Sequence, residues 1–541
     1  MSVYETPPPS SALVMTIPAR EFVLDRTGSA VPQLLLSASG TVNGSSPAAW
    51  SGGNHARSIR RIWLDTFDWR LYRAGLTLEQ VSRGGDVSLL LTGRDGAVLA
   101  DERLTGPVRP AWPALVAALP AGPLRERVEP VAGVRALCPV ARAVSKVTEL
   151  GALNGDQKTI ARLAVDQMSV TFPGRGTVPP RLTLTPVRGY QAQADRVCRA
   201  LGDLPGISTG QDSALEAALA AAGHRAGNRP GKAGGAPLRP SEPAATAVAA
   251  ILTSLLDALE ANLRGTIRDI DTEFLHDLRI AVRWTRSALK LCGRALPDGL
   301  VGQYRPEFRW LGELTTPTRD LDVYLLRFPA MSAGLVGAAA SDLAPFADYL
   351  AVARASAHRR LVRGLRSARF SRLVTGWRAD LADVRAPRRK PAVAELAAGT
   401  IAAADRRALR AGQLITASSP AESLHDLRKR CKELRYLVEM FGSLHDRAQH
   451  WQAIRELRAL QDCLGDFQDA SLQQAEIRAF AGQMLADRRV PAETLLAMGE
   501  IAAGLARRQR KARGEFDARF ADFAGAASQA RLLGLSGSAA A

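Results

Sequence analysis

Residues 276–292 read HDLRIAVRWTRSALKLC, and residues 425–441 read HDLRKRCKELRYLVEMF. The two stretches start with the same four letters and lie 149 residues apart. Asp320 and Asp469 are also separated by 149 residues, so the similarity extends beyond a single helix. Self-similarity at a fixed distance indicates an internal duplication.

Each stretch is predicted to form an amphipathic helix with one basic and one apolar side. At about 100° per residue, the basic residues of the first copy share an arc of about 80°, and apolar residues such as Leu278 and Val282 lie opposite. The basic side of the first copy contains His276, Arg279, Arg283, Arg286 and Lys290. The second copy repeats it with His425, Arg428, Lys432 and Arg435, beside which Lys429 is also a predicted binding residue. Glu439 takes the place of Lys290 and weakens that end of the second face.

The stacked like charges favour an anionic ligand. An ordinary solvated helix face mixes signs and gains from Glu–Lys pairs one turn apart, whereas like charges at this spacing repel. Each motif spans roughly 20 Å, which is longer than a small phosphate metabolite requires and fits an elongated polyanion. Arginine supplies planar, permanently charged donors for phosphate oxygens. Further basic residues that widen the predicted surface are Arg354, His358, Arg406 and Arg410.

The role of the two motif histidines stays open at this point. His276 and His425 could donate to a phosphate oxygen, or they could cap or pack at the start of their helices.

The two motifs resemble those of the CHAD family, the conserved histidine α-helical domain, in which each helical half carries an H-x-x-R-x-x-x-[RK]-x-x-[RK] helix. Tyr436 matches the family's LRY position, and the segments LGELTTPTRDLDV and LQDCLGDFQDA look like its two acidic segments. The resemblance covers roughly residues 244–525. It implies an all-helical domain that binds inorganic polyphosphate and can associate with polyphosphate granules. Asp320 and Asp469 would then orient arginines or cap helices rather than bind metal.

The chain is predicted to hold two domains of different class. Up to about residue 205 it reads as short strand-like runs, and from about residue 244 it shows apolar residues every three or four positions. The expected fold is α+β and multidomain, with an antiparallel β-tunnel followed by a helical bundle with a two-fold internal repeat. The expected segments are a disordered terminus (1–14), the strand-rich domain (15–210), a Gly/Pro-rich linker (211–243), the helical domain (244–525) and a flexible tail (526–541).

Residues 63–78, WLDTFDWRLYRAGLTL, resemble a motif of the CYTH family, whose β-tunnel binds triphosphates with basic residues and metal with carboxylates. The metal-binding E-x-E-x-K strands of that family have no match here. The opening strand contains Arg20-Glu21-Phe22, and the late strand reads Arg181-Leu182-Thr183. Because a hard divalent ion needs clustered carboxylates, we expect an inactive relative with no metal and no cofactor. A basic channel through Arg70, Arg73 and Arg181 is an open alternative.

The composition narrows the function classes further. A formal charge of +18 and a pI near 10.4 favour an anionic partner. The five cysteines are widely spaced, which argues against a disulfide framework or a zinc site. No signal peptide or long uninterrupted apolar run is evident, so a cytoplasmic protein with no membrane partner is expected.

The leading interpretation is therefore a non-enzymatic polyphosphate-binding protein. The alternatives are a metal-dependent tri- or polyphosphatase acting through the tunnel, and binding to nucleic-acid backbones, which would be non-specific because base-reading motifs are missing. The oligomeric state is open, with a homodimer as one expectation.

Overall fold

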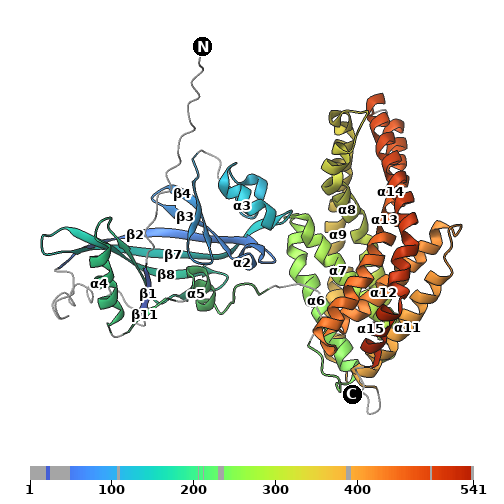
Figure 1. The fold of residues 1–541 in the computed structure, drawn as a ribbon, viewed down its shortest axis with the longest axis horizontal. Helices are drawn as coiled ribbons and strands as arrows, with labels where there is room; N and C mark the ends of the chain where they lie inside the picture. The colour runs from blue at the N-terminus through green and yellow to red at the C-terminus, as the bar shows by residue number, and fades with distance from the viewer. Residues whose placement is uncertain are drawn as a thin grey trace. The chain divides into compact units, whose positions relative to one another are not determined.

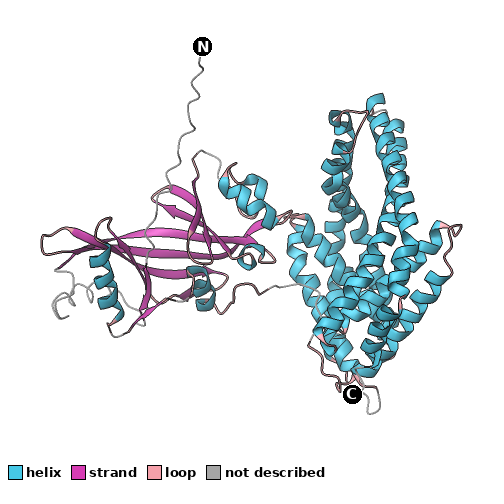
Figure 2. Ribbon diagram, viewed as in Figure 1, coloured by secondary structure: helices cyan, strands magenta, loops and turns pink. Residues whose placement is uncertain are grey.

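The computed structural model describes residues 20–24, 49–105, 110–204, 206–210, 212–228, 237–385, 391–487 and 490–537. The chain forms two compact units, Met1–Arg229 and Pro230–Ala541. The first is built on an antiparallel sheet and the second is helical, which confirms the predicted α+β layout (Figure 2). The terminus predicted to be disordered, residues 1–14, lies outside the described residues.

The first unit contains one antiparallel sheet with the strand order β11-β1-β10-β8-β7-β2-β3-β4-β5, while β6 pairs with β7 and β9 with β8 (Figure 1). The strands are β1 (Arg20–Leu24), β2 (Ala49–Thr66), β3 (Leu76–Arg83), β4 (Asp86–Gly93), β5 (Val98–Arg103), β6 (Ala114–Leu115), β7 (Ala136–Leu153), β8 (Thr159–Phe172), β9 (Gly176–Thr177), β10 (Arg181–Pro186) and β11 (Ile207–Thr209). Its helices are α2 (Arg70–Arg73), the 3₁₀ turn η1 (Val116–Ala118), α3 (Pro123–Ala132), α4 (Gln191–Gly202) and α5 (Ala214–Ala221). Strands β2 and β7, each 18 residues long, form the centre of the sheet.

The segment that resembles the CYTH motif forms a tight link between β2 and β3. The Asp65 carboxylate accepts hydrogen bonds from the backbone N–H groups of Leu71 and Tyr72, each at 2.9 Å. Burial raises the pKa of Asp65 to about 6, although these N–H donors act in the opposite direction. Gly75 then turns the chain with φ of 75°, a left-handed conformation that glycine adopts without strain. Asp65 therefore has a structural role in closing this turn.

The second unit is a bundle of long helices. They are α6 (Ala244–Ile267), α7 (Thr272–Leu291), η2 (Gly293–Ala295), α8 (Leu300–Ala333), η3 (Ala340–Leu343), α9 (Ala344–Leu365), α10 (Ala368–Ala382), α11 (Val393–Gln413), α12 (Ala421–Met440), η4 (Gly442–Leu444), α13 (Arg447–Ala486), α14 (Ala492–Ala524) and α15 (Ala526–Gly537). Helices α7 and α12 begin 149 residues apart and also end 149 residues apart. The turns η2 and η4 keep the same offset. The helix bounds thus agree with the predicted duplication.

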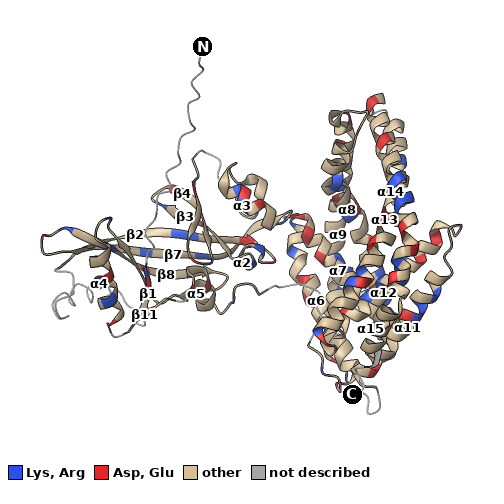
Figure 3. Cartoon of the chain, viewed as in Figure 1, with Lys and Arg blue, Asp and Glu red and all other residues tan. Residues whose placement is uncertain are grey.

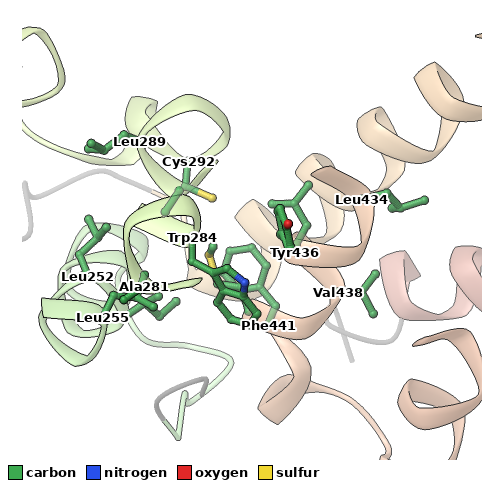
Figure 4. Close-up of a cluster of buried hydrophobic side chains, with 14 of the residues drawn as sticks. Leu252, Leu255, Ala281, Trp284, Leu289, Cys292, Leu434, Tyr436, Val438 and Phe441 are labelled. Atoms are coloured by element: carbon green, nitrogen blue, oxygen red, sulfur yellow. The ribbon is translucent and has the colours of Figure 1, made fainter. Parts of the chain in front are cut away.

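The apolar sides of α7 and α12 are buried in one core, as predicted. Leu278 and Val282 of α7 and Leu434 of α12 are at most 1% exposed. The rings of Trp284 on α7 and Tyr436 on α12 lie 5.8 Å apart between centroids (Figure 4). The two basic helices are therefore neighbours, joined through their aromatic side chains.

Two predicted boundaries are wrong. The predicted linker, residues 211–243, contains α5, whose Leu215 and Leu219 pack in a core of the first unit. Near its other end, Leu238 is buried in the helical core, while residues 229–236 lie outside the described part of the chain. The predicted flexible tail forms α15, which buries Leu532 and Leu535. In each case a short apolar stripe is buried against another part of the fold. The glycine-rich or alanine-rich composition of the segment itself does not predict that contact.

Helix α6 is the one described helix that is long and apolar enough to cross a membrane. Its most apolar window is 61% buried inside the helical unit, so tertiary packing accounts for much of its apolar composition.

Candidate anion-binding site

Arg279 is fixed against the wall of the bundle. Its Nη1 donates to the hydroxyls of Thr315 at 2.9 Å and Thr316 at 2.8 Å, both on α8. Burial and the neighbouring arginines lower the pKa of Arg279 to about 10, although Asp320 acts in the opposite direction. The guanidinium therefore keeps its charge at neutral pH in a fixed position.

Arg283 and Arg286 are held by contacts that do not neutralise them. The Arg283 guanidinium lies over the Tyr436 ring, 5.4 Å from its centroid. Arg286 lies against Gly312 of α8, where a Cβ atom would come within 2.7 Å of Arg286 Nη1, so a larger residue there would displace the guanidinium. Within the described ranges, neither arginine forms an ion pair with a carboxylate. Both charges are thus available to a ligand.

The basic residues of α12 are more fully engaged. Arg428 forms an ion pair with Asp469 at 3.0 Å, and Arg435 lies 3.6 Å from Glu439. Asp469 orients an arginine, as the resemblance implied. Lys429 pairs at 3.1 Å with Asp426 on the same helix.

Lys432 is surrounded mainly by cations. Burial lowers its pKa to about 8, with Arg428, Arg283 and Arg435 acting in the same direction and Asp469 opposing them. An anion that joins this amine and the three guanidiniums would stabilise its charged form.

Three adjoining pockets run along α7 and are here called the basic groove. The His276 pocket, about 410 Å³, is lined by His276, Arg279, Arg283, Arg319, Arg327, Asp320, Asp469 and Glu476, among others. The Trp310 pocket, about 750 Å³, is lined by Arg283, Arg286, Lys290, Arg305, Arg309, Trp310, Glu313, Arg369 and Glu433, among others. The Arg407 pocket, about 450 Å³, is lined by Lys290, Leu291, Arg407, Asp426, Lys429, Arg430 and Glu433. The His276 and Trp310 pockets share Arg283, and the Trp310 and Arg407 pockets share the Lys290–Glu433 ion pair, so each pocket adjoins the next. Figure 3 colours the basic positions of these helices blue.

Eight of the fourteen predicted site residues do not line these three pockets. They are His425, Arg428, Lys432 and Arg435 on α12, and Arg354, His358, Arg406 and Arg410 on other helices. Arg354 pairs with Asp322 at 2.8 Å and with Asp269. His358 Nε2 lies 2.9 Å from the carbonyl oxygen of Thr266. Arg406 and Arg410 are exposed on α11, and it is their neighbour Arg407 that reaches the groove.

The two motif histidines differ in their surroundings. His276 lines one end of the groove. His425 is half-buried, and its Nδ1 atom is buried without a hydrogen-bond partner among the described residues.

Several groove residues escaped the sequence interpretation. Arg305, Arg309, Arg319 and Arg327 come from α8, and Arg369 comes from α10. Arg305 and Arg309 are one helical turn apart, and this spacing could have predicted a basic helix face. The same pair of positions does not hold two arginines in the second copy. Only the packing of α8 beside α7, and of α10 beside α8, brings these charges to the motif.

The sheet of the first unit brings two carboxylates from different strands to one arginine. Arg61 of β2 forms ion pairs with Glu79 of β3 at 3.0 Å and Asp166 of β8 at 2.8 Å. Burial raises the pKa of Glu79, although Arg61 opposes this. Each carboxylate is thus neutralised by an arginine rather than left open to a cation. In the part of the chain that the structure describes, no group of three or more His, Cys, Asp or Glu residues could hold a metal ion.

Two of the three arginines of the suggested channel, Arg70 and Arg181, are paired as well. Arg181 is buried, lies 2.6 Å from Glu21 and donates to the backbone oxygen of Asp212 at 2.7 Å. Arg70 pairs with Asp68 at 3.1 Å. Arg73 is exposed on α2.

Comparison with known proteins gives the following matches. Residues 250–478 match the family model of the CHAD domain. The crystal structure of the CHAD domain from the plant Ricinus communis is 24% identical, with a TM-score of 0.46, and the match covers 54% of this chain and 96% of that chain. PptA from Streptomyces chartreusis is 21% identical, with a TM-score of 0.42, covering 52% of this chain and 99% of that chain. A putative adenylate cyclase from Bacillus halodurans is 14% identical, with a TM-score of 0.26, covering 36% of this chain and 92% of that chain. No curated protein matches.

Proposed function

Residues 250–478 form a CHAD domain, and from this premise we propose that the helical unit binds inorganic polyphosphate in the basic groove. The observation that carries the proposal is the pair Arg283 and Arg286, two guanidiniums that line the groove without an ion-pair partner among the described residues. Arginine guanidinium groups donate in a planar fork that matches phosphate oxygens.

The length of the groove favours a chain over a small phosphate. His276 and Lys290 line opposite ends of α7 within it, and the intervening 14 residues rise roughly 21 Å. Several phosphates of one chain can then contact successive cations. Each contact is modest alone, and their sum gives the affinity.

A nucleic-acid backbone is the competing ligand for the same surface. It shares the repeating phosphate charge and the counterion release that makes binding salt-dependent. The groove offers one indole, Trp310, and its ring is covered by the Arg369 guanidinium at 4.3 Å. Base stacking therefore has little support here, and we propose that nucleic acid binds only weakly and without sequence preference.

The proposed role is binding rather than catalysis. In the sheet of the first unit, Arg61 lies between Glu79 and Asp166, so a divalent cation would have to displace a buried, hydrogen-bonded arginine. We propose that this unit does not hydrolyse phosphoanhydrides. Retention at polyphosphate granules in the cytoplasm would follow from the binding activity.

The test is a titration of the full chain with long-chain polyphosphate and with duplex DNA at equal phosphate concentration, repeated over a range of salt. Polyphosphate is expected to bind more tightly at every salt concentration, with affinity falling steeply as salt rises. Equal affinity for the two polymers, or no binding of polyphosphate, would reject the proposal.

A further inference from the structure

We infer that the principal phosphate-chain site belongs to the first repeat, in the Trp310 pocket between α7, α8 and α10, to which the second repeat adds only Glu433 of α12. The inference rests on the proposed function and names its principal site. The pocket joins two motif arginines to Arg305, Arg309 and Arg369, which lie outside the motif.

The second repeat lacks two of the residues that line this pocket. Because the helix bounds keep the 149-residue offset, equivalent positions can be compared directly. Arg305 is replaced by Ile454, and Trp310 is replaced by Ala459. The counterparts of Arg305 and Trp310 are therefore missing from α13, which instead carries Arg458 and places Arg455 over the Trp451 ring, 5.1 Å from its centroid.

The second repeat also neutralises the cations that it keeps. Glu439 occupies the position of Lys290. Its carboxylate lies 3.6 Å from Arg435 and 3.4 Å from Arg458, the counterparts of Arg286 and Arg309. One carboxylate thus engages both arginines that would correspond to the open charges of the first repeat.

The first repeat holds its additional cations in place without closing the pocket. Arg369 stacks on Trp310 at 4.3 Å and forms a two-point ion pair with Glu307 at 2.8 and 3.0 Å. Arg309 has Glu313 at 3.8 Å, but both side chains are more than 70% exposed, so solvent screens this pair. Arg305 has no ion-pair partner among the residues described and is exposed. An incoming phosphate chain therefore meets open charge on the α8 wall.

The test compares two double charge reversals in the full chain, with long-chain inorganic polyphosphate as the probe. Arg305→Glu/Arg309→Glu reverses the wall of the Trp310 pocket. Arg455→Glu/Arg458→Glu makes the same change of net charge on the corresponding turn of α13, where both arginines are exposed. Circular dichroism and thermal melting of both variants confirm that they are folded.

The first variant is expected to weaken binding at least tenfold, and the second less than threefold. Equal losses would show that the effect is one of net charge and would overturn the inference. A larger loss in the Arg455/Arg458 variant would place the site in the second repeat. These outcomes all require that the unmodified chain binds polyphosphate, so failure of the proposed function appears separately, as absence of binding before any substitution.

Discussion

The guanidinium of Arg283, from the first repeat, lies 5.4 Å over the ring of Tyr436, from the second. The contact joins the two motif helices through an aromatic side chain, and Trp284 lies 5.8 Å from the same ring. A cation over an aromatic face keeps its charge while its position is fixed. The ring thus holds Arg283 beside the groove without neutralising it.

Replacing Tyr436 with leucine should therefore weaken polyphosphate binding by roughly threefold to tenfold, since a cation over a ring contributes about 0.5–2 kcal/mol. Tyr436→Phe should keep full affinity. Because the Tyr436 hydroxyl is buried without a hydrogen-bond partner among the described residues, its removal should leave the melting temperature unchanged or higher. Titration and thermal melting of both variants check this, and equal affinity of the leucine and phenylalanine variants would contradict the role of the ring.

Arg283→Glu/Arg286→Glu should reduce polyphosphate affinity by roughly 100-fold or more, equivalent to about 2.8 kcal/mol. The fold should persist, because neither arginine has an ion pair to lose within the described ranges. Reversal of Arg428 is a poorer test, since a glutamate there would face Asp469. Binding is followed by titration and folding by circular dichroism. Retained affinity in a folded variant would exclude this face as the site.

Polyphosphate affinity should fall as pH rises above about 8, the pKa of Lys432 in the free protein. The groups facing this amine are Arg428 and Arg435 on α12, Arg283 on α7 and Asp469 on α13. A bound polyanion favours the charged amine and raises its pKa, so binding above pH 8 must take up a proton. The affinity then drops by up to tenfold per pH unit until the pKa of the bound state is reached.

Lys432→Arg provides the control for this pH dependence, because arginine stays charged over the whole range. Titrations between pH 7 and 10 should show a flatter profile for this variant. The same slope in both proteins would assign the pH dependence to another group.

Arg61→Met should destabilise the first unit by roughly 3–5 kcal/mol, because it leaves Glu79 and Asp166 buried without their counter-charge. The triple change Arg61→Met/Glu79→Gln/Asp166→Asn should recover most of this loss by removing the charges together. Calorimetric melting distinguishes the two. No difference between the single and triple variants would show that the ion pairs contribute little to the sheet.

Phosphate release from tripolyphosphate, nucleoside triphosphate or long-chain polyphosphate should stay at background with Mg²⁺ or Mn²⁺. The reason is that Arg61 and Arg181 occupy the carboxylates Glu79, Asp166 and Glu21 that could hold the metal. A colorimetric phosphate assay on the full chain measures this. Metal-dependent release that disappears in Glu79→Gln would restore the hydrolase interpretation.

Periodicity in the sequence was sufficient to predict the two-domain layout, the duplication and both motif helices. This is because an amphipathic helix encodes its buried side locally: Leu278, Val282 and Leu434 lie at helical spacing and are buried where the pattern placed them. The motif cations lie opposite that stripe for the same geometric reason.

Only the tertiary structure decided which cations remain open to a ligand. In the sequence, Arg354, Arg428 and Arg283 are all arginines on predicted basic helix faces. In the structure, Arg354 pairs with Asp322 and Arg428 with Asp469, whereas Arg283 lies over the Tyr436 ring. Arg305 and Arg369 join the groove because α8 packs beside α7 and α10 packs beside α8. Helical periodicity depends on residues three and four positions apart, so it can be predicted from a single sequence. Charge pairing and pocket formation depend on residues far apart in the chain, so they cannot.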